Sequence, residues 1–181
     1  MELGGGGEVL GSLTKLAGEG HVFSYGITQA TKGLSLYKPG STHGILVDFD
    51  ALDKHVPPPF DKEWRGGPGQ VIHDKFVVCD FNGDNPSVFT GSSNLASGGE
   101  KQNGDNLLAI HDSEFATAFA VEAIRLVDHY HFRDAMEQAT KDNPLTLQGQ
   151  NPKGEDPWWK PYYDDRDLKS VERELFIRPS P

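Results

Sequence analysis

The sequence is poor in cysteine, in positive charge and in long apolar runs. Its 181 residues include one cysteine, which excludes an internal disulfide and a zinc site built from cysteines. Its 17 lysines and arginines stand against 27 aspartates and glutamates, a formal net charge of −10 that argues against a broad basic face for nucleic acid. No apolar run reaches about 18 residues, so no segment is predicted to span a membrane.

The first residues also lack the basic and apolar regions of a signal peptide. This absence predicts a cytoplasmic location, a prediction that does not apply if the chain is a fragment. The length suits one domain, or one lobe of a two-lobed enzyme. With 21 glycines, 12 prolines and 36% apolar residues, the domain is expected to be rich in loops.

Hydrophobic patterns predict several short strands followed by one long helix. Strands are expected at residues 21–27, 34–37, 45–49, 71–80, 87–91 and 106–110, and helices at 8–18, 113–139 and 165–176. The long helix should begin at a cap formed by Asp112 or Ser113. Proline and glycine clusters predict a long loop over residues 50–70. Strands followed by a long helix indicate a layered α/β or α+β fold.

The same patterns divide the chain into three parts. Residues 1–19 are predicted to be a flexible lead and a short first element. Residues 20–142 would form the main domain, and residues 143–181 a polar, proline-punctuated tail that packs on it.

The stretch from Val71 to Asp80 carries the first chemical signal. Residues two apart on a strand share a face, so His73 and Lys75 should point the same way. An imidazole beside an ammonium group is costly to desolvate unless an anion binds there. Asp80 falls on the opposite face of a straight strand, where an ion pair or turn cap is the plainer interpretation.

Two later stretches complete the pattern. Gly91-Ser92-Ser93-Asn94 offers small residues that let the backbone approach an anion, with hydroxyl and amide donors beside it. Asp105, in Asn103-Gly104-Asp105-Asn106, is placed to accept a hydrogen bond from the far ring nitrogen of His73.

Together these stretches resemble the phospholipase D superfamily. Its signature is H-x-K-x4-D followed by G-S-x-N, matched here by His73, Lys75 and Asp80 and then by Gly91, Ser92 and Asn94. The family's downstream acid is usually glutamate, so Asp105 is a departure. The resemblance covers residues 71–133 well, and implies a layered α+β domain with a central mixed β-sheet flanked by helices.

The resemblance implies an enzyme that cleaves phosphodiesters with no metal or other cofactor. In the family a histidine attacks phosphorus, giving a phosphohistidine that water hydrolyses, while a second histidine protonates the leaving group. Carried over, His73 is the nucleophile or the acid. Lys75 and Asn94 bind phosphate, Ser92 supports it, and Asp105 orients His73. Asp80 matches the motif but is interpreted as structural.

The chain has a single H-x-K, because no other histidine has a lysine two residues later. A full site then needs either a homodimer that places two copies of His73 face to face, or a missing N-terminal lobe with the second motif. A half-domain that is catalytically silent and acts as a scaffold is the alternative from another functional class.

The substrate stays open at this point. The acidic balance weighs against a long duplex, and no basic amphipathic helix favours membrane docking. Phospholipid-like or small phosphodiesters are slightly favoured over an endonuclease activity, and hydrolysis cannot be separated from transfer to an alcohol. His129 and His131 face about 200° apart on a helix, so they predict no metal site, and Cys79 is expected to be a small hydrophobe.

Overall fold

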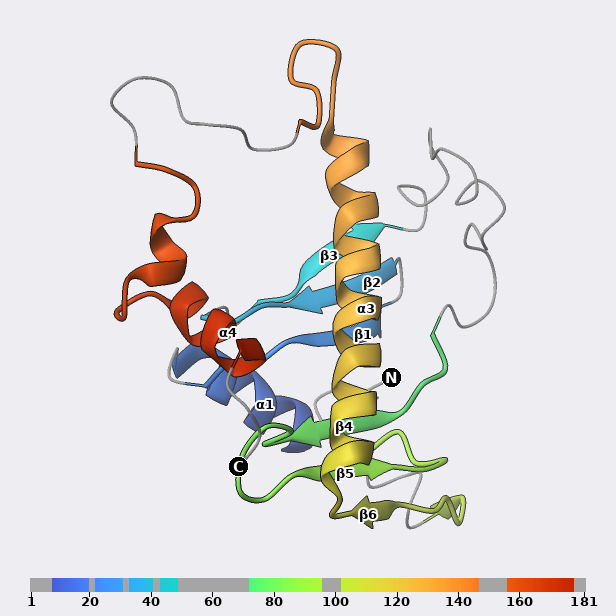
Figure 1. Cartoon of the computed structure of the whole chain (residues 1–181). Coiled ribbons are helices and arrows are strands. Elements are labelled where there is room, and N and C mark those ends of the chain that lie inside the picture. Colours follow the sequence, from blue (N-terminus) through green and yellow to red (C-terminus); the bar gives the residue numbers. More distant parts are fainter. Residues whose placement is uncertain are drawn as a thin grey trace.

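The computed structural model describes residues 8–19, 22–30, 33–40, 43–48, 72–95, 102–146 and 156–177 (Figure 1). The predicted loop at 50–70 lies outside these residues. The helices are α1 (Glu8–Glu19), α3 (Ser113–Gln138), α4 (Leu168–Ile177) and the short 3-10 helix η3 (Lys160–Tyr163). Six strands accompany them, so the α+β class is confirmed.

The described strands form two separate antiparallel sheets. One contains β1 (Gly26–Ala30), β2 (Gly33–Tyr37) and β3 (Ile45–Asp48), and the other β4 (Phe76–Cys79), β5 (Ser87–Thr90) and β6 (Leu108–Ile110). The expectation of one central mixed sheet was therefore wrong for the described residues. Within each sheet every strand pairs with the next along the chain, and such neighbours pair antiparallel unless a long crossover joins them.

Two strands begin five residues later than predicted. The first begins at Gly26 rather than at residue 21, because the Phe23 ring packs on Tyr25 at 5.1 Å and on Phe176 at 6.3 Å between centroids. These contacts place Phe23 and Tyr25 in an aromatic cluster with Phe176, outside the strand. The strand predicted at 71–80 forms backbone pairs with β5 only from Phe76 onward, and Phe76 pairs with Thr90.

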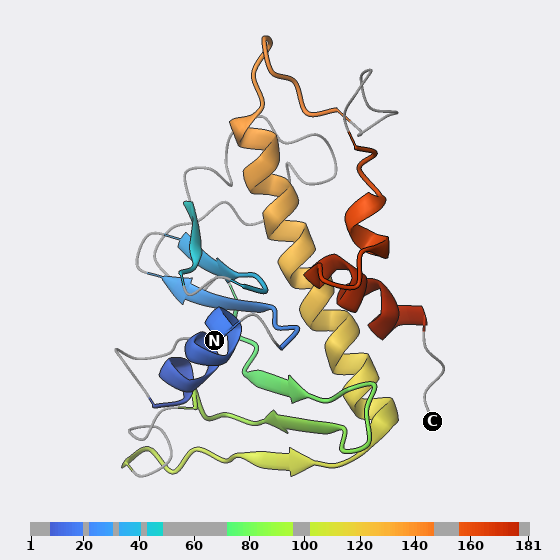
Figure 2. The same ribbon diagram turned by 90° about the vertical axis from the view of Figure 1, so that its left-hand side faces the viewer.

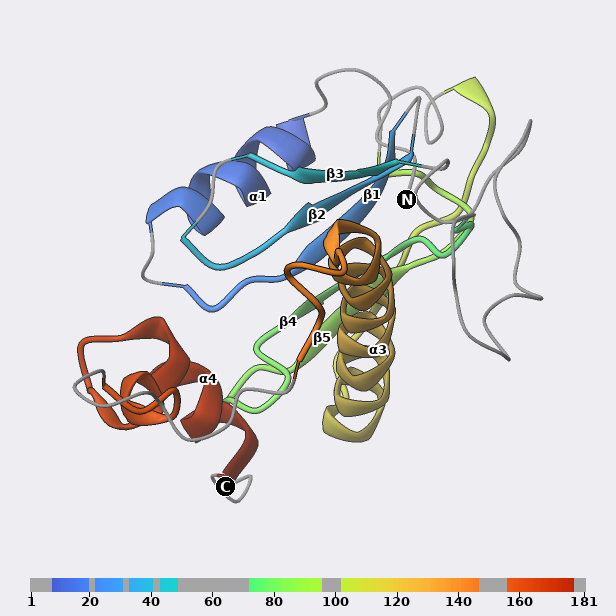
Figure 3. The ribbon, with the colours of Figure 1, turned by 90° about the horizontal axis from the view of Figure 1, so that it is seen from above.

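Helix α3 crosses both sheets, as Figure 2 shows. Asp112 caps it, accepting hydrogen bonds from the backbone N–H groups of Glu114 (2.9 Å) and Phe115 (3.0 Å). In the view from above, α1 and α3 lie on opposite sides of the sheet β1–β3 (Figure 3). This arrangement explains why Leu36 and Val47 are fully buried, with Tyr130 of α3 packed against them.

Apolar residues three and four apart in the sequence, among them Phe115 and Val127, predict the buried face of α3, with Arg133 on its solvated side. The structure differs from this prediction in part. Val127 is buried as expected, but Phe115 is 54% exposed and Arg133, expected on the solvated side, is buried. The small residues Ala116 and Ala120 are the buried ones near the start of the helix. Because alanine lets a helix approach a sheet closely, the face of α3 that packs on the sheets includes Ala116 and not Phe115.

The C-terminal helix α4 contacts the turn between β4 and β5. Asn82 Nδ2 donates to the backbone carbonyl of Leu175 at 2.6 Å, and the rings of Phe81 and Phe176 lie 5.8 Å apart. The hydroxyl of Tyr25 donates to Glu172, and burial followed by the Glu172 charge raises the pKa of Tyr25 to about 12. The division of the chain at residues 19 and 142 stays a prediction.

Candidate active site

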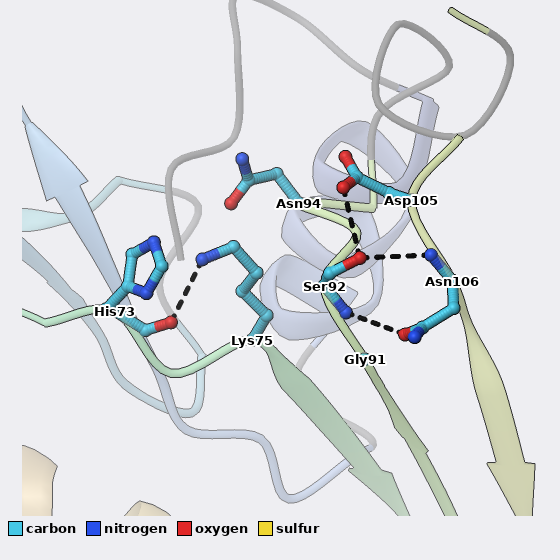
Figure 4. A pocket seen from close by; sticks show the side chains of 7 residues that line it. All are labelled: His73, Lys75, Gly91, Ser92, Asn94, Asp105 and Asn106. Carbon is cyan, nitrogen blue, oxygen red and sulfur yellow. Dashed lines mark hydrogen bonds between the residues drawn. The ribbon is translucent and has the colours of Figure 1, made fainter. Parts of the chain in front are cut away.

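A polar pocket of about 630 Å³ lies at one end of the second sheet (Figure 4). The chain enters β4 here, leaves β5 here and enters β6 here, because antiparallel neighbours bring the start of one strand beside the end of the next. The pocket is lined by His73, Lys75, Gly91, Ser92, Asn94, Asp105 and Asn106. Five of the six candidate side chains from the sequence therefore share one pocket.

Lys75 is the cationic side chain of this pocket. It is 8% exposed, and its ammonium group donates to the backbone carbonyl of His73 at 3.0 Å. Thr90 at the end of β5 donates its hydroxyl to the carbonyl of Lys75 at 2.9 Å, which ties the segment before β4 to the sheet. An ammonium group has three protons, so two remain for an anion in the pocket.

His73 lies in the extended segment ahead of β4 and is exposed. Its ring and the Lys75 ammonium group are on the same side of this segment, as the spacing of two predicts (Figure 4). The ring makes no hydrogen bond to another described residue. It is open to a ligand or to a second molecule.

The turn after β5 presents Asn94 to the pocket. Gly91 opens the turn with φ +154° and Leu95 closes it with φ +54°, both in the region that favours glycine. The hydroxyl of the buried Ser93 accepts from the N–H of Leu95 at 3.0 Å. The Asn94 Oδ1 atom is buried and has no hydrogen-bond partner in the described part of the chain. A buried acceptor without a partner requires an explanation, such as the opposite orientation of the amide or a bound water or ion.

Ser92 and Asp105 differ from expectation. The Ser92 hydroxyl donates to Asp105 Oδ1 at 3.0 Å and accepts from the N–H of Asn106 at 3.0 Å (Figure 4). Asp105 lies across the pocket from the His73 ring and does not hold it. A hydroxyl has one proton, and here Asp105 receives it, so Ser92 has none to donate to phosphate in this arrangement.

Asp80, the last residue of the H-x-K-x4-D match, lies outside the pocket. Its carboxylate accepts from the N–H of Asn85 at 2.8 Å, and its carbonyl accepts from the N–H of Gly83 at 3.0 Å. Its φ of +52° is one that aspartate tolerates better than most residues. The structure gives Asp80 the turn-capping role that was its plainer interpretation.

The other reactive side chains lie elsewhere. Cys79 is exposed rather than a buried small hydrophobe. Partial desolvation, and then the charge of Asp80, raises the pKa of its thiol, which disfavours the thiolate. His131 Nε2 lies 2.7 Å from Lys38 Nζ, while the ring of His129 packs edge-on against Tyr130. In the part of the chain that the structure describes, no cluster of three acids, histidines or cysteines is arranged to hold a metal. None of the helices in that part is long and apolar enough to cross a membrane.

Comparison with family models matches residues 42–127 to the family described as cardiolipin synthase, PLD-like domain. The matched range contains every residue of the pocket. This match, over a little less than half of the chain, supports its resemblance to the phospholipase D superfamily. Phosphodiesterase-type activity is what a phospholipase D-like domain suggests. No curated protein and no solved structure matches this phospholipase D-like chain.

Asn106 is the pocket residue whose contribution the sequence did not reveal. Besides its N–H, its side-chain Oδ1 accepts from the N–H of Ser92 at 2.9 Å, and its carbonyl accepts from the N–H of Ser93 at 3.1 Å. The one signal for it was its place, directly after Asp105 and before a strand. That signal located a loop without saying which side chain would reach across to β5.

Proposed function

We propose that the protein is a phospholipase D-type phosphodiesterase that works through a phosphohistidine intermediate as a homodimer. The observation that carries the proposal is the pocket that joins His73, the buried Lys75 and the unpartnered amide of Asn94. A buried cation with two free protons beside a nucleophile is suited to a phosphoryl group. Rotation of the Asn94 amide by 180° would present its NH₂ group to the same anion.

The reaction follows from these groups. An unprotonated ring nitrogen of His73 attacks phosphorus, a P–N bond forms, and the P–O bond to the leaving group breaks. The leaving oxygen takes a proton from the imidazolium of a second His73. Water then attacks phosphorus, that second imidazole accepts its proton, and the P–N bond breaks to give a phosphomonoester and free His73. Lys75 and Asn94 stabilise the charge on the non-bridging oxygens throughout.

The second histidine must come from outside the pocket of one chain, because the sequence holds a single H-x-K. A second copy related by a two-fold axis supplies it with the fewest assumptions. The exposure of His73 and the absence of a described hydrogen-bond partner for its ring are compatible with a facing copy. Ser92 and Asp105 are proposed as residues that hold the turn after β5, and Asp80 as a residue of the fold.

Phospholipid-like or small phosphodiesters are the proposed substrates. A net charge of −10 offers little attraction for a long polyanion beyond the pocket. The description of the matching family refers to the synthesis of cardiolipin, a phospholipid. An endonuclease of the same superfamily is the second candidate, and hydrolysis and transfer to an alcohol share the first chemical step.

The proposal is tested by hydrolysis of a chromogenic bis-aryl phosphodiester in excess EDTA. The wild type should be active, and His73→Ala should lose about 10⁴-fold or more because the nucleophile is gone. His111→Ala is the matched control, since His111 is exposed and bonds Ser87 rather than any pocket residue. Activity that survives in His73→Ala would overturn the mechanism.

Two further arms separate the alternatives. Light scattering reports the mass in solution, and a strict monomer without activity would favour the silent half-domain. Hydrolysis of choline phospholipid vesicles beside nicking of plasmid DNA separates the substrate classes. Plasmid nicking without lipid hydrolysis would replace the proposed substrate by nucleic acid.

A further inference from the structure

The turn from Gly91 to Leu95 has few intrinsic reasons to hold its shape. Two of its residues have positive φ, and one of them, Leu95, is not glycine. Ser92 at its apex is exposed. The contacts that hold this turn must therefore come from another element.

Three of its four N–H groups beyond Gly91 have partners. Those of Ser92 and Ser93 donate to Asn106, to Oδ1 at 2.9 Å and to the carbonyl at 3.1 Å, while that of Leu95 donates to the Ser93 hydroxyl. The N–H of Asn94 has no partner within the described residues. It lies on the same residue as the unpartnered side-chain amide.

Asn106 also fills the space beside Gly91. A Cβ placed on Gly91 would lie 2.4 Å from the Asn106 carbonyl oxygen and 2.5 Å from its Oδ1, distances that real Cβ atoms do not show. Together with the hydrogen bond from the Asn106 N–H to the Ser92 hydroxyl, four contacts join this one residue to the turn.

We infer that Asn106 is a positioning residue, which holds the turn so that Asn94 directs its backbone N–H and its side-chain amide at one anion. The inference rests on the proposed function for the identity of that anion, a phosphoryl group. The side-chain oxygen of Asn106 already accepts a hydrogen bond from Ser92, and Asn106 touches no reacting atom. Its effect reaches the substrate through the turn.

Titration with inorganic phosphate, followed by calorimetry and by amide NMR shifts, tests this inference. Asn106→Ala should weaken phosphate binding by about two- to tenfold, the range expected for loss of one such hydrogen bond. The N–H signals of Ser92 and Asn94 should shift. Asn143→Ala is the matched control, because the described bonds of Asn143 use its backbone and it lies in the loop after α3.

Asn106→Asp provides the second variant. It keeps an acceptor for the Ser92 N–H, so the turn and the fold should persist, while the added negative charge weakens phosphate binding. Salt screens a charge and does not replace a missing acceptor. The defect of Asn106→Asp should therefore shrink in about 0.5 M salt, and that of Asn106→Ala should persist.

A folded Asn106→Ala that binds phosphate like the wild type would overturn the inference, whatever its thermal stability. An Asn106→Asp variant whose defect in phosphate binding does not shrink in about 0.5 M salt would overturn it too. Failure of the proposed function appears elsewhere, as a wild type that binds phosphate but cleaves no bis-aryl phosphodiester.

Discussion

Both sheets have three antiparallel strands in the order of the chain, yet they contribute differently to the molecule. In the sheet β1–β3 the middle strand carries Leu34 and Leu36, both without exposure, between α1 and α3. In the sheet β4–β6 the edge strand begins with Leu108, which is 54% exposed, and the strand ends carry the polar pocket.

The comparison separates stability from chemistry. The middle strands of both sheets bury side chains, Leu34 and Leu36 in the first and Val88 in the second, and the pocket lies where the ladder of the second sheet has stopped. Residues ahead of β4 and after β5 are free of the alternation that a strand imposes, so they can aim donors at one point. The proposed function lies on these irregular ends, as loops on a rigid scaffold commonly carry function.

The largest stability effect is expected in the first sheet. Leu36→Ala removes a fully buried side chain and should lower the free energy of unfolding by about 2–5 kcal/mol. Leu108→Ala on the second sheet is the matched control and should cost less than about 0.5 kcal/mol, the usual limit for exposed positions. Urea unfolding measures both, and equal losses would contradict the contrast between the sheets.

A smaller effect is expected at the far end of β4. Asp80→Ala loses the hydrogen bond from Asn85 and places alanine at positive φ, at a cost of about 1–2 kcal/mol. Turnover by the folded enzyme should stay unchanged, because Asp80 lies outside the pocket. Asp84→Ala in the same exposed turn is the control. A loss of kcat without a loss of stability would contradict the structural role of Asp80 and indicate a catalytic one.

The smallest effect is expected in the pH dependence of stability. It involves His131 of α3, which contacts Lys38 beside the first sheet. Burial, and then the charge of Lys38 just after β2, lowers the pKa of His131, against weaker opposing effects of Asp134 and Asp128. As the pH drops below about 6.5, the unfolded chain binds more protons than the folded one. The free energy of unfolding therefore decreases as the pH is lowered.

His131→Gln removes this titration while keeping an acceptor for Lys38. Urea unfolding between pH 5 and 7 should show a flatter dependence in the variant. The pH profile of phosphodiester hydrolysis should not change, since that profile belongs to the pocket of the second sheet. A change in the activity profile would mean that the two sheets are not independent in this respect.

Much of the pocket follows from the sequence because its spacing matches strand geometry. His73 and Lys75 are two residues apart, and Asn94 follows the next strand along the chain, so antiparallel pairing alone brings them to the same end of the sheet. The cap of α3 was predicted at Asp112 or Ser113 for a similar reason, since capping depends on local sequence, and the structure places it at Asp112.

Other features depend on competition between distant groups. The sequence suggested that Asp105 would hold His73, but the Ser92 hydroxyl is nearer and takes the carboxylate. Arg133 follows the polar pattern of a solvated face and is nonetheless buried. The sequence also could not predict whether the strands form one sheet or two, because short apolar strands have the same pattern in both arrangements.

Helix α3, about 39 Å long by its 26 residues, is synthesised after every described strand. Both sheets are therefore synthesised before the helix that covers them is complete. Until then the apolar faces of β2 and β5 have no partner on that side, and strands in this condition are prone to pair with other chains. The order of elements along the chain therefore delays the packing of both sheets until α3 is available.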